Sequence, residues 1–259
     1  MISKNEVRQI QETLLNVWPA KEHFFLNGWI LRFTNGVTSR ANSVLPLNYY
    51  GNKNKIDSDI DFVEKAYKIY GLPSIFTMHD YHEPKYLREK LIERGYKEVS
   101  LTTTMGASIT DINYCNLNTD YNYEIHNDRV SEFNEFLAKY SKRPIEQQFI
   151  IKKICKRIKI PQTRFILTKD GNNIIGTTMG VLSVYDSLYI ADVFVNPKYR
   201  RKKIASSMLI NLIKDLAPNN RAINIWLQVE VENKVAIKFY EHLGLKSLFN
   251  YYYLQKLVK

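Results

Sequence analysis

The sequence has few of the features that mark secreted, membrane-spanning or metal-binding proteins. Its two cysteines, Cys115 and Cys155, stand alone, with neither a metal-ligand spacing nor a second pair that would build a disulfide framework. No run of eighteen apolar residues occurs, so no membrane-spanning helix is expected. The N-terminal stretch MISKNEVRQIQETLL lacks the apolar centre and small-residue cleavage site of a signal peptide. We therefore expect a soluble protein of a reducing compartment, the cytoplasm.

Positive charge is the one bulk property in excess, with a formal net charge of +11. Between Lys139 and Lys169 there are ten Lys or Arg residues and one acid, Glu146. This run is compatible with a solvated helix face or with a functional electropositive wall. The net charge itself points to an anionic ligand, a nucleic acid or a membrane surface. The histidines, His126 among them, show no metal-ligand spacing, and we predict no metal.

A length of 259 residues with 45% apolar residues predicts two domains. The stretch DINYCNLNTDYNY, residues 111–123, is polar and Asn-rich and lacks apolar periodicity, which is typical of a linker. We place the boundary near residue 118, so that the domains cover residues 1–118 and 119–259.

The second domain shows the clearer pattern of elements. Its apolar periodicity predicts the order β-α-α-β-β-β-α-β-α-β, with a Gly171-Asn172 turn inside an antiparallel meander of three strands. Gly244 ends the last helix. The fold class is therefore α/β (α+β), a mixed and mostly antiparallel sheet flanked by helices.

The segment VNPKYRRKKIASSML, residues 195–209, places four cations in a row directly before a predicted helix. A helix N-terminus carries roughly +0.5 elementary charge, so cations there are repelled. Unpaired N–H groups at such a terminus bind phosphate, and charge-assisted bonds to an anion would outweigh the repulsion. The pattern predicts a phosphate site at Arg200, Arg201, Lys202, Lys203, Ile204, Ala205 and Ser206.

Two motifs within this element order resemble those of the GNAT superfamily of N-acetyltransferases, over nearly all of residues 119–259. The family's acetyl-CoA loop, V-x-P-x-Y-R-x-x-G-x-G/A, is matched at Val195, Pro197, Tyr199, Arg200, Lys203, Ile204 and Ala205. Lys203 departs from the pattern because it stands where the family has its first glycine. The second signature, L-x-V-x(3)-N-x-x-A-x(3)-Y-x(3)-G, is matched at Leu227, Val229, Asn233, Ala236, Tyr240 and Gly244.

The resemblance implies acetyl-CoA as co-substrate and Tyr240 as general acid. A phenol with a pKa of about 10 keeps its proton at neutral pH and can pass it to a thiolate. Asp192 and Glu230 stand where family members often place a carboxylate base. The alternatives are a core tyrosine with a satisfied hydroxyl and ordinary polar residues at strand ends. Further cofactor contacts are implied at Val193, Phe194, Val195, Asn233, Ala236 and Phe239.

The first domain contains RANSV, residues 40–44, which resembles a segment that recurs in a bacterial group of two-domain GNAT proteins. Asn35-Gly36 predicts a hairpin turn between strands. Four polar residues near it are candidates for an acceptor pocket, although hairpin structure and interdomain packing explain them equally well: Arg32, Arg40, Asn42 and Ser43.

The first domain also echoes the second. One offset separates Gly95 from Gly244 and Leu91 from Tyr240. The acid tyrosine has no counterpart at residue 91, and LPLNYYGNKNKID stands where a phosphate loop should be. We therefore predict two tandem GNAT-like domains, the first a degenerate copy and the second catalytic.

These observations predict an N-acetyltransferase that transfers acetyl from acetyl-CoA to a primary amine by direct attack. The acceptor is expected to be a small-molecule or peptide amine; nucleic acid and membrane are not expected as partners, and a homodimer is left open. Two alternatives remain: an aminoacyl-tRNA-dependent acyltransferase, and a non-enzymatic nucleic-acid or acyl-CoA binding protein. The sequence does not identify the acceptor, the base or the oligomeric state.

Overall fold

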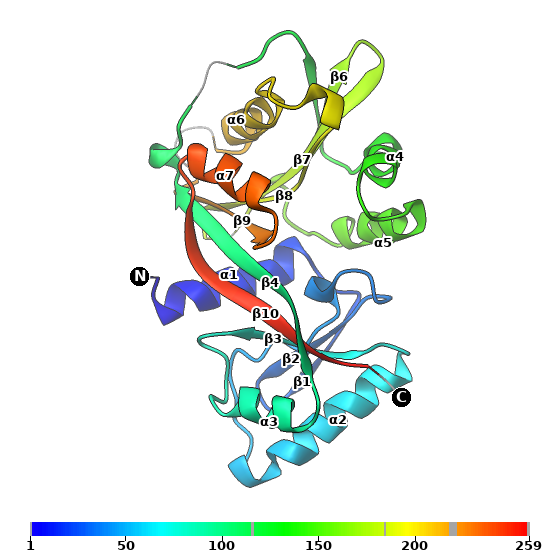
Figure 1. Ribbon diagram of the computed structural model, residues 1–259, viewed down its shortest axis with the longest axis vertical. Coiled ribbons are helices and arrows are strands. Elements are labelled where there is room, and N and C mark those ends of the chain that lie inside the picture. Colours follow the sequence, from blue (N-terminus) through cyan, green and yellow to red (C-terminus); the bar gives the residue numbers. More distant parts are fainter. Residues whose placement is uncertain (1, 115–116, 184, 218–221, 258–259) are drawn as a thin grey trace. The chain divides into compact units, whose positions relative to one another are not determined.

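The computed structural model of the protein describes residues 2–114, 117–183, 185–217 and 222–257, so Cys115 lies outside the described part. Within these ranges no helix is both long and apolar enough to cross a membrane. The elements follow along the chain (Figure 1) as α1 (Lys4–Val17), β1 (Glu22–Leu26), β2 (Trp29–Phe33), α2 (Ile56–Ile69), β3 (Ser74–His79), α3 (Leu87–Glu93), β4 (Lys97–Ser108), β5 (Asn122–His126), α4 (Ser131–Tyr140), α5 (Ile145–Cys155), β6 (Thr163–Asp170), β7 (Asn173–Leu182), β8 (Ser187–Val195), α6 (Ile204–Leu216), β9 (Asn224–Glu230), α7 (Lys234–His242) and β10 (Lys246–Lys256).

The chain forms two compact units whose segments interleave. Unit 1 comprises Met1–Thr103, Glu230–Glu232 and Phe249–Lys259, and unit 2 comprises Thr104–Val229 and Asn233–Leu248. Strands β4 and β10 therefore contribute residues to both units. The units are not successive segments of the sequence, and the functional boundary near residue 118 stays a prediction.

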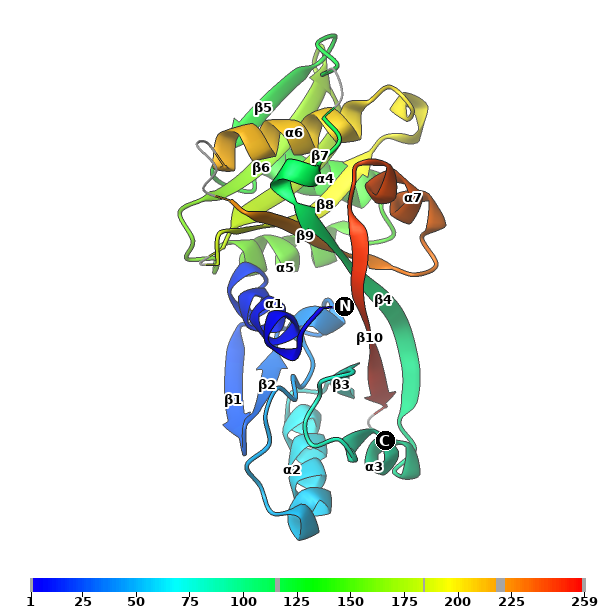
Figure 2. The same ribbon diagram turned by 90° about the vertical axis from the view of Figure 1, so that its left-hand side faces the viewer.

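In unit 2 the strand order is β4-β9-β8-β7-β6-β5. Strands β5 to β8 pair antiparallel, whereas β8 and β9 run parallel. From β5 to β10 the elements follow the predicted order, including the three-stranded meander and its turn at residues 171–172. The predicted mixed α/β fold is confirmed. Figures 1 and 2 show α6 on one face of this sheet and α4 and α5 on the other.

Helix α6 packs closely on β7 because two glycines leave room for it. Its buried apolar residues recur at helical spacing, among them Ile204, Met208 and Leu212. A β-carbon added to Gly176 would lie 3.3 Å from Ile204 Cγ2, and one added to Gly180 would lie 3.1 Å from Leu212 Cδ1. The N-terminal turn of α6 is thereby fixed against the sheet.

In unit 1, β1 and β2 form a hairpin whose turn is Asn27-Gly28, both with positive φ. The prediction of a hairpin at Asn35-Gly36 is wrong. The chain does turn there, but the Asn42 side-chain oxygen accepts from the amides of Thr34 and Gly36 at 2.6 and 3.1 Å. These amides are therefore engaged by a side chain, and a 3₁₀ helix follows in place of a strand.

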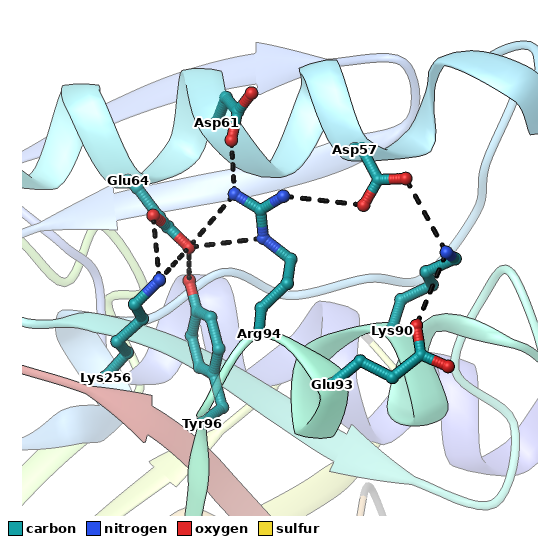
Figure 3. A network of polar contacts seen from close by, with 8 residues as sticks. All are labelled: Asp57, Asp61, Glu64, Lys90, Glu93, Arg94, Tyr96 and Lys256. Atoms are coloured by element: carbon teal, nitrogen blue, oxygen red, sulfur yellow. Dashed lines mark hydrogen bonds and ion pairs between the residues drawn. The ribbon is translucent and has the colours of Figure 1, made fainter.

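The last strand is anchored in unit 1 by strand pairing and by charge. Residues 251–256 of β10 pair antiparallel with β3. Lys256 contacts both carboxylate oxygens of Glu64 on α2, at 3.0 and 3.2 Å (Figure 3). Arg94, just after α3, also pairs with carboxylates of α2, including that of Asp57 at 3.4 Å. This network links α2, α3 and the C-terminal strand.

Candidate active site

The loop between β8 and α6 ends in an open helix N-terminus. Asn196 turns the chain after β8 by accepting two backbone hydrogen bonds, at 3.1 Å through its side chain and at 2.8 Å through its carbonyl. The N-cap of α6 is Lys203, whose side chain makes no capping hydrogen bond. The first amides of a helix have no partner within it. Those of residues 204–206 therefore point outward, the arrangement that binds phosphate.

Lys203 has a left-handed backbone, with φ 59° and ψ 11°. Glycine adopts this conformation at little cost, whereas an L-residue loses about 1–2 kcal/mol in it. The loop thus keeps the shape expected for glycine at this position. Arg201 is also left-handed, with φ 63°. Two such residues within three positions show that the surroundings hold the loop in this shape.

Asn118, from the stretch predicted to be a linker, braces this loop. Its side-chain amide donates to the carbonyl of Lys202 at 2.9 Å, and its backbone N–H donates to Ser207 Oγ at 2.9 Å. The Lys202 ammonium donates to the Tyr121 hydroxyl at 3.3 Å and lies 5.1 Å from the ring centre of Tyr199. The described end of this stretch is therefore a structural brace.

Part of the basic run has a structural explanation. Lys169 pairs with Glu124 and Arg164 with Asp215, each at 2.8 Å. Two further lysines lie in the last turn of α5, where the helix dipole favours cations. By contrast, no carboxylate in the described part of the chain pairs with three exposed loop cations: Arg200, Arg201 and Lys203.

Strands β8 and β9 diverge next to this loop. Their last paired residues are Ile190 and Leu227, but both strands continue beyond them. At the same point the register between β7 and β8 shifts by one residue, and Asp192 has φ 51°. A bulge bends the strand that carries it, so the two parallel strands separate here.

Val193, Phe194 and Val195 follow the bulge, where β8 no longer pairs with β9; we call this unpaired interval between the two strands the gap. The valines pack on the apolar core, and the Phe194 ring lies 6.0 Å from that of Phe136 on α4. The amide of Asn196 donates to the β7 carbonyl of residue 175 at 2.8 Å. Backbone groups alternate between the two edges of a strand. The amides of Val193 and Val195 therefore face away from β7, toward the gap.

Tyr240, the predicted acid, lies on α7 and is 7% exposed. Burial raises the pKa of its hydroxyl, which keeps it protonated at neutral pH. Within the described residues this hydroxyl has no hydrogen-bond partner. No described group of the chain therefore holds this hydroxyl, and its role as the acid stays a prediction.

Helix α7 is capped at both ends. Asn233 is its N-cap, with the side-chain oxygen accepting from the Ala236 amide at 3.2 Å. At the other end, the backbone N–H of Asn113 donates to the Leu243 carbonyl at 2.9 Å. Gly244 follows with φ 100°, and a β-carbon on it would collide with the backbone carbonyl of Asp111. Two of the motif residues thus have structural roles, whatever contact they make with a ligand.

Asp192, one candidate base, is paired with a buried arginine that sequence analysis did not single out. Arg129 Nη1 donates to Asp192 Oδ2 at 2.5 Å, and the two side chains are 1% and 12% exposed. This ion pair engages Oδ2 of Asp192 with a fixed donor and leaves little of the carboxylate exposed. The geometry therefore disfavours Asp192 as a base. In the sequence, Arg129 looks like any polar residue before a helix.

The remaining candidates belong to unit 1. Arg32 is buried and donates to the Ser43 carbonyl and hydroxyl at 2.9 and 2.7 Å. The Asn42 side chain is fully engaged with backbone groups of residues 34–38. The guanidinium of Arg40 lies over the indole ring of Trp18. Glu230, the other candidate base, is exposed at the end of β9. Arg32 and Ser43 are bonded to each other and Asn42 holds the preceding turn, and the acceptor role of all four pocket candidates stays a prediction.

Comparison with known proteins accounts for this arrangement. Residues 122–245, which contain both motifs, match the acetyltransferase (GNAT) family. Residues 4–90 match a family described as the C-terminal part of the probable histone acetyltransferase Rv0428c. The chain is 27% identical over 252 residues to the uncharacterized N-acetyltransferase YobR of Bacillus subtilis, covering 96% of this chain and 98% of that protein. Residues 122–245 are therefore a GNAT acetyltransferase segment.

Solved structures show that the likeness of this acetyltransferase to GNAT folds extends over the whole chain. A GCN5-related N-acetyltransferase from Kribbella flavida superposes with a TM-score of 0.71 at 12% identity, covering 97% of this chain and 95% of that one. A tandem GNAT protein from the clavulanic acid biosynthesis pathway gives 0.63 at 7% identity, covering 98% and 96%. At these identities the likeness concerns the fold alone.

Proposed function

We propose that this acetyltransferase transfers an acetyl group from acetyl-CoA to a primary amine by direct attack of the amine on the thioester. The observation that carries the proposal is the uncapped N-terminus of α6 behind the exposed cations of the β8–α6 loop. Acetyl-CoA brings a pyrophosphate and a 3′-phosphate. Unpaired amides, a positive helix end and guanidinium or ammonium groups are the donors that such anions require.

The gap between β8 and β9 supplies a place for the rest of the cofactor. In this proposal the amides of Val193 and Val195 hold the pantetheine arm and polarise the thioester carbonyl. Fixed donors aimed at a developing oxyanion act strongly where water is excluded. Ala205, at the start of α6, is small enough to let the phosphates approach the backbone.

In the reaction, the amine nitrogen forms a bond to the carbonyl carbon and the carbon–sulfur bond breaks. Tyr240 gives its proton to the departing thiolate. Burial disfavours the charged form of the tyrosine hydroxyl and of the departing thiol alike, so it raises the pKa of each. The pKa difference between them therefore stays small enough for the proton to pass from Tyr240 to the sulfur. The amine attacks in its neutral form, and its nitrogen gives up one proton to a base once the new bond has formed. That proton balances the one that Tyr240 passes to the thiolate, and Tyr240 is reprotonated from solvent or from the base. Because Asp192 is held by Arg129, we propose Glu230, directly or through water, in preference to Asp192.

The decisive experiment is acetyl-CoA turnover by the full chain against a panel of small-molecule and peptide amines, read by release of free thiol. Amine-dependent release supports the proposal, and the best acceptor defines the substrate class. If no amine stimulates release, nucleic-acid binding becomes the alternative to test. Such binding would fall by orders of magnitude between low and physiological salt.

A further inference from the structure

Arg129 joins three elements of unit 2 through one side chain. Its guanidinium lies 4.4 Å from the ring centre of Phe133, on α4. Its donors are distributed over α4, α5 and β8: Nε to Asn134 Oδ1 at 2.7 Å, Nη2 to Gln148 Oε1 at 3.0 Å, and Nη1 to Asp192 Oδ2 at 2.5 Å. Asn134 and Gln148 are themselves 0% and 1% exposed. The guanidinium therefore has a single defined position.

The two amide partners are also oriented. Asn134 Nδ2 donates to the Val130 carbonyl at 3.2 Å, and Gln148 Nε2 donates to Ser141 Oγ at 3.3 Å. Each amide thus keeps its oxygen for Arg129. A buried ion pair seldom stabilises a fold more than well-packed apolar residues of the same volume. Stability alone does not explain this network, whereas a need for fixed geometry does.

The carboxylate that Arg129 holds belongs to the bulge of β8. Asp192 has φ 51°, a left-handed conformation that is uncommon outside glycine, asparagine and aspartate and that contacts on two sides hold here. Its carbonyl accepts from Thr177 Oγ1 of β7 at 3.3 Å, and its side chain is held by Arg129. The bulge is therefore held from the β7 side and from the α4–α5 face at once.

We propose that Arg129 and Asp192 form a clamp that sets the divergence of β8 from β9 and thereby aims the amides of Val193 and Val195 at the thioester. The clamp residues are positioning residues, and Asp192 is not the base. This inference rests on the proposed function, because the amides matter only if acetyl-CoA lies between the strands. A displacement of about 1 Å in such a site can cost roughly a hundredfold in rate.

The test compares two ligands in Arg129→Met and Asp192→Asn. Acetyl-CoA needs both the loop and the gap, whereas adenosine 3′,5′-bisphosphate reports phosphate binding at the loop. Each variant should lower kcat/KM by roughly ten- to a hundredfold and weaken acetyl-CoA binding in calorimetry. Each should bind the bisphosphate as the wild type does. Arg164→Met, which removes a partly exposed ion pair elsewhere in unit 2, is the matched control and should change neither affinity.

Two further readouts separate the clamp from other roles. The double variant should be no worse than either single variant, since both remove the same pair. The pH profile of Asp192→Asn should keep the acid limb of the wild type. Loss of that limb would identify Asp192 as the base and overturn the clamp. Equal weakening of both ligands with a lower Tm would reduce the pair to general structural support, which also overturns it.

Amide exchange tests the clamp without any ligand. The Asn196 amide bonds to β7 just beyond the bulge, and in Arg129→Met and Asp192→Asn it should exchange at least about tenfold faster, as for a locally loosened segment. The amide of Ile210, in the middle of α6, should be unaffected. Unchanged exchange at Asn196 in both variants would sink the clamp. If exchange rises as expected but the wild type binds neither ligand, the clamp stands and the proposed function fails.

Discussion

The side-chain amide of Asn113 donates to the carbonyl of His242 at 2.9 Å, two residues beyond Tyr240 on α7. The end of the helix that carries the predicted acid is thus closed by a segment that precedes β5. Terminal carbonyls of a helix need such partners. The position of Tyr240 therefore depends on residues outside the span that matches the GNAT family.

Asn113→Ala should lower the free energy of unfolding by about 1 kcal/mol, the usual contribution of one hydrogen bond, in urea denaturation. It should also reduce kcat more than it changes the affinity for acetyl-CoA, because α7 loosens near Tyr240. Asn250→Ala, on an exposed part of β10, is the control and should stay within about 0.5 kcal/mol. Equal losses in both variants would contradict the capping role.

Tyr240→Phe should lower kcat by roughly a hundredfold, the range for a lost proton donor, and leave acetyl-CoA affinity nearly unchanged. Since burial raises the pKa of Tyr240 above its ordinary value of about 10, the wild type should lose no activity to ionisation of this group below that pH. Steady-state kinetics from pH 6 to 10 check both points. Unchanged turnover at saturating cofactor would reduce Tyr240 to a packing residue.

Lys203→Gly should raise the free energy of unfolding by about 1 kcal/mol, because it relieves a left-handed L-residue, and should leave CoA binding intact or improved. Lys203→Ala removes the ammonium but keeps the strained backbone. Thermal unfolding and calorimetric CoA titration of the two variants separate the effect of the left-handed backbone from the effect of the ammonium group. If both variants bind CoA markedly more weakly, Lys203 is a phosphate ligand and not a substitute for glycine.

Arg200→Ala and Lys202→Ala should each weaken CoA binding by about 1–3 kcal/mol through the loss of charge-assisted bonds. Whichever residue serves the 3′-phosphate should show a smaller loss with dephospho-CoA. Lys153→Ala, a lysine on α5 outside the loop, is the control for net charge. An equal effect of the control would mean that the loop acts only through the overall field of the protein.

Lys256→Ala should destabilise the protein by roughly 0.5–1 kcal/mol, since its contact with Glu64 is half shielded from solvent, with the two side chains 35% and 25% exposed. The loss should shrink in 1 M salt, which screens ion pairs. Lys90→Ala, in a more exposed pair of the same network, should cost less. Urea denaturation of both variants at low and high ionic strength measures these differences in the free energy of unfolding.

The elements around the candidate site could be predicted because their signals are local, whereas the roles of the site residues stay predictions. The alternation of apolar residues marks β6 to β8, and the 3.6-residue spacing marks α6. The motif at residues 195–205 places a helix start directly after a strand. The left-handed shape at Lys203 agrees with its alignment to a family glycine, but in a lysine it is the surrounding loop that imposes this shape.

The tertiary structure alone decided which polar residues are buried and what they hold. Nothing near Arg129 in the sequence distinguishes it from a solvated arginine, since its partners lie on α4, α5 and β8. Asn113 and Asn118 look like linker residues, yet each caps or braces an element far along the chain. The Asn35-Gly36 turn failed as a hairpin because a side chain eight residues from Thr34 took the amides of that turn. Periodicity records which face of an element is apolar, but hydrogen bonds between distant segments exist only once those segments have packed together.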